Sequence, residues 1–299
     1  MDPFLFVELP VLAGIIALSW FLVFRPLQKE RAQRKLPFTR DLLRGPGETC
    51  LEKTVELSDK LESQLLLMLI APAAVVAYAF GIWHGTHFPQ KQLPVSVGVV
   101  LALALLASAW SMVRTRALIR ERRQYRLGFL GERHTAQALA RLTGDGYVLF
   151  HDLQCRKPGT DEAFNIDHAL IGPTGIFIVE TKTRSKRANQ PGRAEVIFDG
   201  HALDFGTHRE TAAIDQTLAN ASLFAKLVKG RTGLDLPVTP ILSIPGWYVT
   251  ARTPKPLFVG NPDQIPAHIR SRPATATLDK RAFEQARTLC EELARSKTE

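Results

Sequence analysis

Residues 165–182 read N-I-D-H-A-L-I-G-P-T-G-I-F-I-V-E-T-K, and this stretch predicts a β-hairpin. Two apolar runs flank the turn-forming tetrapeptide G-P-T-G at 172–175. If the chain folds back in the middle of that turn, Asp167 faces Glu180 across the hairpin, with Cβ atoms ~5 Å apart. Because side chains alternate along a strand, Lys182 lies on the same face as Glu180. Two carboxylates and one ammonium group therefore converge at the open end of the hairpin.

This convergence predicts a metal site. Two neighbouring carboxylates repel unless a proton or cation lies between them, and hard divalent cations take oxygen ligands. Hydrolysis of a phosphodiester needs a metal to polarise the phosphoryl oxygen and activate a water, and a cation for the developing charge. Asp167, Glu180 and the Thr181 carbonyl would be ligands, and Lys182 would orient or deprotonate the water or stabilise the phosphorane. Glu-x-Lys also occurs as a plain ion pair on exposed strands, so these residues leave both interpretations open.

A third acid precedes the hairpin in a predicted helix at 127–142. Glu132 shares the apolar stripe of Ala136, Leu139 and Ala140, which follow it by 4, 7 and 8 positions. An acid on a core-facing stripe is costly unless it is paired or bound to a metal. The alternative is that Glu132 only interacts with the dipole at the helix start.

Composition limits the class of protein without defining it. The chain has 299 residues and a formal net charge of +9, which suits an anionic partner. Its three cysteines lie far apart in the sequence. This spacing argues against a zinc site or a disulfide framework and fits a reducing compartment.

Residues 1–115 form a predicted transmembrane region, with spans at about 4–24, 65–83 and 95–113. The second and third spans are 19-residue stretches without a charged side chain, close to the ~20 residues that a membrane helix needs. The alternatives are a secretory signal for the first span, although no basic segment precedes it, and buried core helices for the other two.

Basic residues define the orientation of these spans. Five Lys or Arg follow the first span between 25 and 35, six Arg follow the third between 114 and 126, and the intervening loop at 84–93 carries one Lys. The positive-inside rule places the N-terminus outside and residues 116–299 in the cytoplasm. We expect an integral protein of the plasma (inner) membrane whose basic 116–126 segment contacts lipid headgroups, or alternatively nucleic acid.

The cytoplasmic part, 116–299, has the pattern of an α/β domain, a mixed sheet with flanking helices. Gln216 lies in one of those helices, two positions off its predicted inward stripe of Ile214 and Leu218, and points toward the sheet end. The predicted elements are helix 127–142, strand 147–153, the hairpin, strand 194–198, helix 210–229, strand 238–249 broken near Pro245-Gly246, strand 257–259 and helix 278–296.

Four motifs together resemble the nuclease-related domain (NERD) family of the PD-(D/E)XK nuclease-like superfamily. They are G-E at 131–132, N-I-D-H at 165–168, the G-P-T-G-I-F-I-V-E-T-K run at 172–182 and D-Q at 215–216. The resemblance covers about 128–250 and implies a restriction-endonuclease-like fold that cuts DNA, or RNA, with Mg²⁺ or Mn²⁺. By this resemblance Glu132, Asp167, Glu180 and Lys182 match the active-site positions, with Glu132 a possible further metal ligand, and Gln216 matches a later glutamine. Asn165 and Arg184 depart from the usual family pattern.

A basic loop follows the hairpin and would track a nucleic-acid backbone beside such a centre, although a solvated loop would have the same composition. Its candidate residues are Arg184, Lys186, Arg187 and Arg193. We expect a membrane-anchored, metal-dependent nuclease. The alternatives are a catalytically silent, membrane-anchored nucleic-acid-binding module and a membrane sensor or interaction protein.

Overall fold

The computed structural model describes residues 42–85, 93–186, 194–251, 257–273 and 278–295. The chain divides into two compact units. One unit comprises Met1–Thr39 and Val55–Arg123, and the other comprises Arg40–Thr54 and Gln124–Glu299. The predicted span at 4–24 lies outside the described residues.

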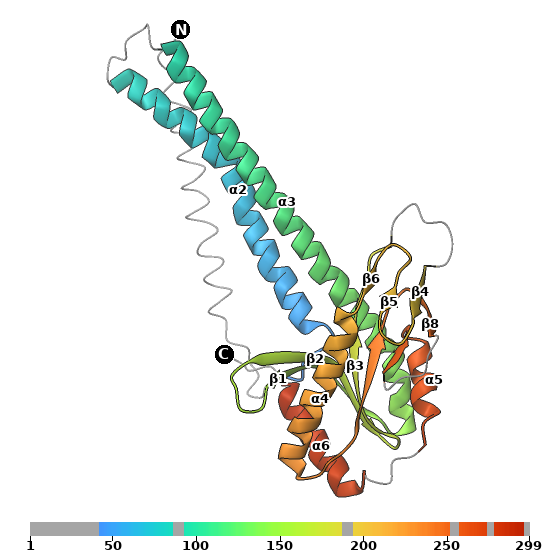
Figure 1. Ribbon diagram of the computed structural model, residues 1–299. Helices are drawn as coiled ribbons and strands as arrows, with labels where there is room; N and C mark the ends of the chain where they lie inside the picture. The colour runs from blue at the N-terminus through green and yellow to red at the C-terminus, as the bar shows by residue number, and fades with distance from the viewer. Residues whose placement is uncertain (1–41, 86–92, 187–193, 252–256, 274–277, 296–299) are drawn as a thin grey trace. The chain divides into compact units, whose positions relative to one another are not determined.

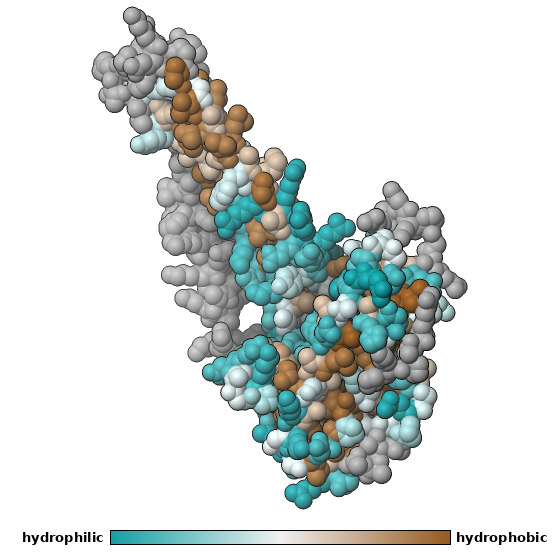
Figure 2. All heavy atoms as spheres, viewed as in Figure 1, coloured by the Kyte–Doolittle hydropathy of each residue, from teal (hydrophilic) through white to brown (hydrophobic). Residues whose placement is uncertain are grey.

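Helices α2 (Glu48–Gly85) and α3 (Leu93–Leu139) contain the predicted spans at 65–83 and 95–113. Within the described part of the chain, these two helices are long and apolar enough to cross a membrane by length and composition. Their apolar side chains lie largely on the surface (Figure 2), as Leu105 does at 70% exposure. Between the two helices, the buried Gln64 amide donates a hydrogen bond of 3.0 Å to the Ser111 hydroxyl, so this polar pair is satisfied inside an apolar interface.

The other unit is built on a five-stranded sheet in the order β1-β2-β3-β7-β9. Strands β1, β2 and β3 pair antiparallel, and β3, β7 and β9 run parallel. The predicted hairpin is β2 and β3, and its register is confirmed: Ile171 pairs with Ile176, and Ala169 with Ile178. The bounds are β1 Val148–Arg156, β2 Ala163–Gly172, β3 Gly175–Thr181, β7 Val238–Ser243 and β9 Phe258–Gly260.

A second sheet has the order β6-β5-β4-β8, so the prediction of one mixed sheet is wrong, whereas a mixed α/β fold with flanking helices is confirmed. The predicted strand at 238–249 divides at Pro245-Gly246, where Gly246 has a φ of +79°, and its two halves enter different sheets. The bounds are β4 Glu195–Phe198, β5 Leu203–Asp204, β6 Arg209–Glu210 and β8 Tyr248–Ala251.

Helices cover both faces of the five-stranded sheet (Figure 1). Helices α4 (Ala212–Thr232) and α6 (Lys280–Leu293) enclose one core, and α5 (Gln264–Arg270) packs on the other with the end of α3 and the 3-10 turn Ala140–Asp145. Helix α5 and the short strands β5 and β6 were not predicted, because they have too few residues to show a period.

The predicted end and inward face of the 210–229 helix are partly wrong. Helix α4 continues past Gly230 and ends at Thr232, and Gly233, with a φ of +71°, forms the left-handed cap. Leu218 is exposed, whereas Ile214, Phe224 and Val228 are buried. The helix is therefore rotated from its predicted position, and this rotation brings polar side chains of α4 toward the hairpin.

Gly131 permits α3 to approach the end of the hairpin closely. A Cβ atom at Gly131 would lie 1.8 Å from Oγ1 of Thr183, which no real contact allows. The glycine of the G-E motif therefore lets the helix lie directly against the chain that leaves β3. This approach sets Glu132 beside the carboxylates of the hairpin.

Candidate functional site

Three buried carboxylates gather at the open end of the β2–β3 hairpin. Asp167 comes from β2, Glu180 from β3 and Glu132 from α3, and each residue is less than a tenth exposed. Lys182, immediately after β3, donates a hydrogen bond of 3.0 Å from Nζ to Oε1 of Glu180. The structure thus brings together all four residues that the motifs singled out.

Each carboxylate has its own set of donors. Asp167 accepts a hydrogen bond of 2.7 Å from the backbone N–H of Thr181, which is itself buried. Glu180 accepts from Lys182 and from the Gln216 amide, at 2.8 Å, on Oε1. Burying a charge is tolerable only when such partners compensate for the lost hydration. Gln216 therefore lies at the site, and it holds one oxygen of Glu180.

Asn220 is a site residue that the sequence interpretation missed. Its side-chain N–H donates both to Oε2 of Glu180, at 3.1 Å, and to the backbone carbonyl of Asn165, at 3.2 Å. Asn220 follows Gln216 by one helical turn, so the two side chains lie on the same face of α4. The i, i+4 spacing of these two amides in the sequence could have indicated that Asn220 accompanies Gln216 at the site.

Glu132 is the least compensated of the three acids. Its Oε1 accepts from the Cys50 thiol at 3.2 Å, whereas its buried Oε2 has no hydrogen-bond partner within the described part of the chain. Burial, reinforced by the charges of Asp152 and Glu180, raises the pKa of Glu132 to about 7 despite the Cys50 bond, which lowers it. Burial also raises the pKa of Asp167 well above its ordinary value, and the charges of Glu180 and Glu132 add to this effect.

Asp152 organises a second layer behind the site, and nothing in the sequence interpretation pointed to it. Its fully buried carboxylate accepts from Nε of Arg44 at 2.7 Å, from the backbone N–H of Thr49 at 2.8 Å and from the Asn165 amide at 2.7 Å. The residue adopts a positive φ of 51°, which is rare outside glycine and best tolerated by Asn and Asp. Asp152 thus joins the segment before α2 to the strand that carries Asp167.

His168 lies on the opposite face of β2 from Asp167. It is fully buried, and its Nδ1 lies 2.9 Å from Nδ1 of His151. Burial lowers the pKa of both imidazoles, that of His151 to about 4. His168 is therefore a packed, hydrogen-bonded strand residue.

Of the four basic residues proposed to contact a nucleic-acid backbone, two are described. Arg184 forms a bidentate pair with Glu210, at 2.8 and 3.1 Å, so its charge is already matched. The ammonium of Lys186 lies 5.9 Å from the ring centroid of Trp247. Arg187 and Arg193 lie outside the described residues.

The donor set suits a divalent cation in its chemistry. In the described ranges, no group of three or more His, Cys, Asp or Glu side chains is arranged to hold a metal ion as it stands. Even so, Glu132, Asp167 and Glu180 offer hard oxygen atoms, and one buried oxygen of Glu132 lacks any partner. A cation would stabilise the ionised forms that burial disfavours. The residues therefore fit such an ion.

The fold and the site define a mixed α/β domain with a buried acid cluster and an adjoining lysine. Residues 127–245 match the family model of NERD, the nuclease-related domain. The match confirms the resemblance that the four motifs indicated. No curated protein and no solved structure matches the chain.

The second layer can be tested by Asp152→Asn. Asparagine keeps the shape and tolerates the positive φ, but it removes the fully buried carboxylate from Arg44, which keeps its ion pairs with the more exposed Glu48 and Glu52. We expect denaturant unfolding of the full chain in detergent to show a loss of about 1–3 kcal/mol in the free energy of unfolding, because buried donors lose a charged acceptor. Asp161→Asn is the matched control, because Asp161 is fully exposed in its ion pair with Arg156, and we expect a change within about 0.5 kcal/mol. Equally small losses of stability in Asp152→Asn and Asp161→Asn would contradict the role of Asp152 in organising the second layer.

The raised pKa of Glu132 predicts a pH dependence in the absence of divalent cations. Because the folded state favours the protonated acid, this contribution to stability is complete below the ordinary pKa of 4.5 and is lost as pH rises through about 7. The loss is on the order of 3 kcal/mol. The free energy of unfolding in EDTA should fall less between pH 5 and pH 8 for Glu132→Gln than for the natural chain. The same difference in both proteins would count against a buried, weakly compensated Glu132.

Proposed function

We propose that the domain hydrolyses phosphodiester bonds of nucleic acid with a divalent cation, Mg²⁺ or Mn²⁺, and that its five-stranded sheet is a PD-(D/E)XK, restriction-endonuclease-like core. The observation that carries the proposal is the convergence of three buried carboxylates and Lys182 within a segment that matches the nuclease-related domain family. The unpartnered oxygen of Glu132 supports a cation at this place.

Each residue then has a role. Asp167, Glu180, Glu132 and the Thr181 carbonyl would hold the cation. When bound, the ion polarises a phosphoryl oxygen and lowers the pKa of a coordinated water. Gln216 and Asn220 hold the Glu180 carboxylate in one orientation. Lys182, whose side chain is 24% exposed, can turn its ammonium toward the substrate to orient the water or stabilise the charge of the phosphorane.

The proposed substrate is DNA, with RNA as the other candidate. The formal net charge of +9 favours a polyanion in general, and the basic residues after β3 adjoin the acid cluster in sequence. Of the two described members of that group, Arg184 pairs with a carboxylate and Lys186 lies over the Trp247 ring. The proposed phosphate contacts are Lys186, Arg187 and Arg193. The bidentate pair with Glu210 makes Arg184 a weaker candidate.

Cleavage can be tested on the purified full chain in detergent, with DNA and RNA, single- and double-stranded, in Mg²⁺, Mn²⁺ or EDTA. We expect cation-dependent products, and we expect Asp167→Asn and Lys182→Ala each to lower the rate by roughly 10²-fold or more, because each removes charge stabilisation from the reacting phosphate. Lys226→Ala, on the exposed face of α4, is the charge control and should cleave normally.

Two results would decide against a nuclease. Unchanged cleavage by both site variants would place the activity elsewhere. Salt-sensitive binding without products under any cation would instead identify the catalytically silent nucleic-acid-binding module. The ion pair between Lys182 and Glu180 is consistent with that alternative, because it already engages the ammonium of Lys182.

We further propose that α2 and α3 anchor the domain in a plasma (inner) membrane with its C-terminal part in the cytoplasm. Their exposed apolar side chains and the arginines at 114–126, which follow the apolar stretch within α3, support this arrangement. Protease protection of tags at the two chain ends in intact and permeabilised cells should show an external N-terminus and an internal C-terminus. A C-terminal tag cleaved in intact cells would reverse the orientation, and a chain extracted from membranes by alkaline carbonate would not be integral.

A further inference from the structure

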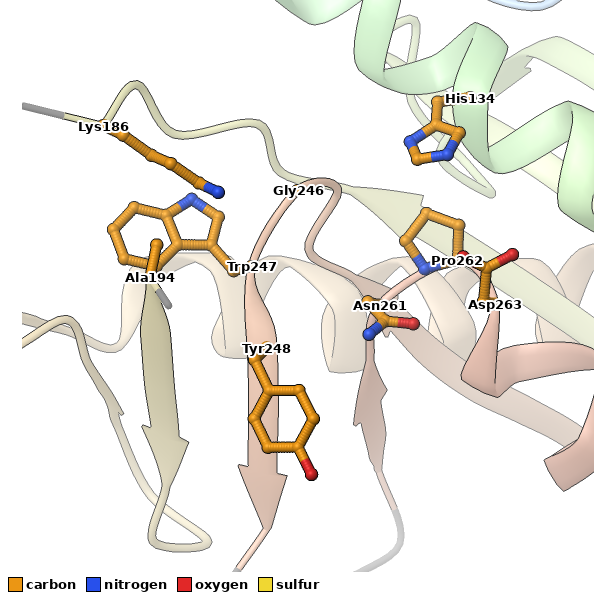
Figure 3. Close-up of a pocket in the computed structure, with 9 residues that line it drawn as sticks. All are labelled: His134, Lys186, Ala194, Gly246, Trp247, Tyr248, Asn261, Pro262 and Asp263. Atoms are coloured by element: carbon orange, nitrogen blue, oxygen red, sulfur yellow. The ribbon is translucent and has the colours of Figure 1, made fainter. Parts of the chain in front are cut away.

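A pocket of about 390 Å³ lies where three parallel strands end. Its lining includes Lys186, which follows β3, residues 246–248, which follow β7, and Asn261, which follows β9 (Figure 3). The carboxyl ends of parallel strands are the usual place for ligands in α/β sheets, because the loops there diverge and leave a crevice. The volume is at the small end of ligand sites, so it suits one nucleotide-sized group and excludes a duplex.

The pocket adjoins the acid cluster through the chain itself. Lys182 donates its backbone N–H to the Ser243 carbonyl at 2.9 Å, and Ser243 precedes the pocket residue Gly246 by three positions. On the opposite side of the pocket, His134 projects from α3 two residues after Glu132, on an exposed face of the helix, whereas Glu132 is buried (Figure 3). The pocket and the acid cluster thus lie at the same end of the five-stranded sheet.

Two aromatic residues line the pocket, of which Trp247 is buried and Tyr248 is half exposed. Trp247 is 6% exposed, donates from its indole N–H to the Arg184 carbonyl at 3.1 Å, and packs edge-on against Phe205 at 4.9 Å between ring centroids. Tyr248 is 49% exposed beside it. The buried indole anchors this part of the chain, and the half-exposed phenol of Tyr248 offers an apolar ring surface to a planar group.

Charged and polar groups surround this apolar wall. The Lys186 ammonium lies 5.9 Å from the Trp247 ring centroid, where it can pair with a phosphate. Asn261 uses its side-chain oxygen to accept from the Gln264 N–H at 3.1 Å, so its amide is held in one position at the pocket. These groups together match a nucleotide: the aromatic surface suits the base, the cation suits the phosphate, and the fixed amide suits the edge of the base.

We propose that this pocket binds one unstacked base of the substrate strand, next to the phosphodiester that is cut, and that the domain therefore acts on single-stranded nucleic acid or on frayed ends. The proposal rests on the proposed function, since it deepens the substrate of the same site. Bases within a duplex are paired and stacked, and exposing one costs a few kcal/mol, which a free strand does not require. Tyr248 and His134 would contact the base, and Lys186 the adjoining phosphate.

The test is binding of a fluorescent DNA strand to the full chain in detergent with EDTA, where no cation supports cleavage. Three probes are compared: the single strand, its duplex, and a strand of the same length in which every nucleotide is abasic. We expect Tyr248→Ala to weaken binding of the base-bearing strand by about 5- to 100-fold, the range for one stacked base, and to leave the abasic strand unchanged. Tyr248→Phe should bind normally.

Further variants separate the phosphate contact from the base contact. Lys186→Ala should weaken binding of both strands, and Lys226→Ala of neither. If Tyr248→Ala does not fold, His134→Ala on the exposed face of α3 provides the second base-side variant with the same expected selectivity. Equal weakening of the two strands by the base-side variants, tighter binding of the duplex than of the single strand, or no effect at all would overturn the proposal.

The same protein with Mg²⁺ separates this proposal from the proposed function. Base-dependent binding without any product supports the pocket and rejects the nuclease. Cleavage with a KM that Tyr248→Ala leaves unchanged supports the nuclease and rejects the pocket.

Discussion

The burial of three carboxylates in one place is the constraint on which the rest of the domain depends. Glu132, Asp167 and Glu180 lie almost out of contact with water, where like charges repel strongly and hydration no longer compensates them. Lys182 and Gln216 donate to Glu180, and the backbone N–H of Thr181 at the end of β3 donates to Asp167. Among the described residues, one oxygen of Glu132 has no hydrogen-bond partner. Such an arrangement costs stability, and this cost is why we place the proposed site at the cluster.

The surrounding layer explains how this arrangement is held in position. Asp152 interrupts the alternation of β1, so that Phe150 and Leu153 both enter the same core although they are three residues apart. The same residue binds Arg44, Thr49 and the Asn165 amide. The segment before α2 therefore forms part of the surroundings of the candidate site. Cys50, in the first turn of α2, donates a hydrogen bond to Glu132.

The hairpin and its register could be predicted because a turn signal and period-2 alternation are local properties. Glu132 could be connected to the hairpin from its place on an apolar stripe. The rotation of α4 could not be predicted, since Ile214 and Leu218 look equally apolar and only packing against the sheet buries the first and exposes the second. For the same reason Asn220 was missed although Gln216 was found. The second sheet was missed because it joins β4 to β8 across about fifty residues of intervening chain.

Short segments of the sequence already define two apolar helices, the acid–acid–lysine face of one hairpin, and the motifs that resemble a nuclease-related domain. Only the folded chain shows which donors each carboxylate receives, that Asp152 and Cys50 contact the candidate site, and that a pocket lies at the ends of β3, β7 and β9. The difference arises from separation along the chain. Alternation and turn chemistry act between near neighbours, whereas burial and hydrogen bonding join side chains that come together only when the sheet and helices pack.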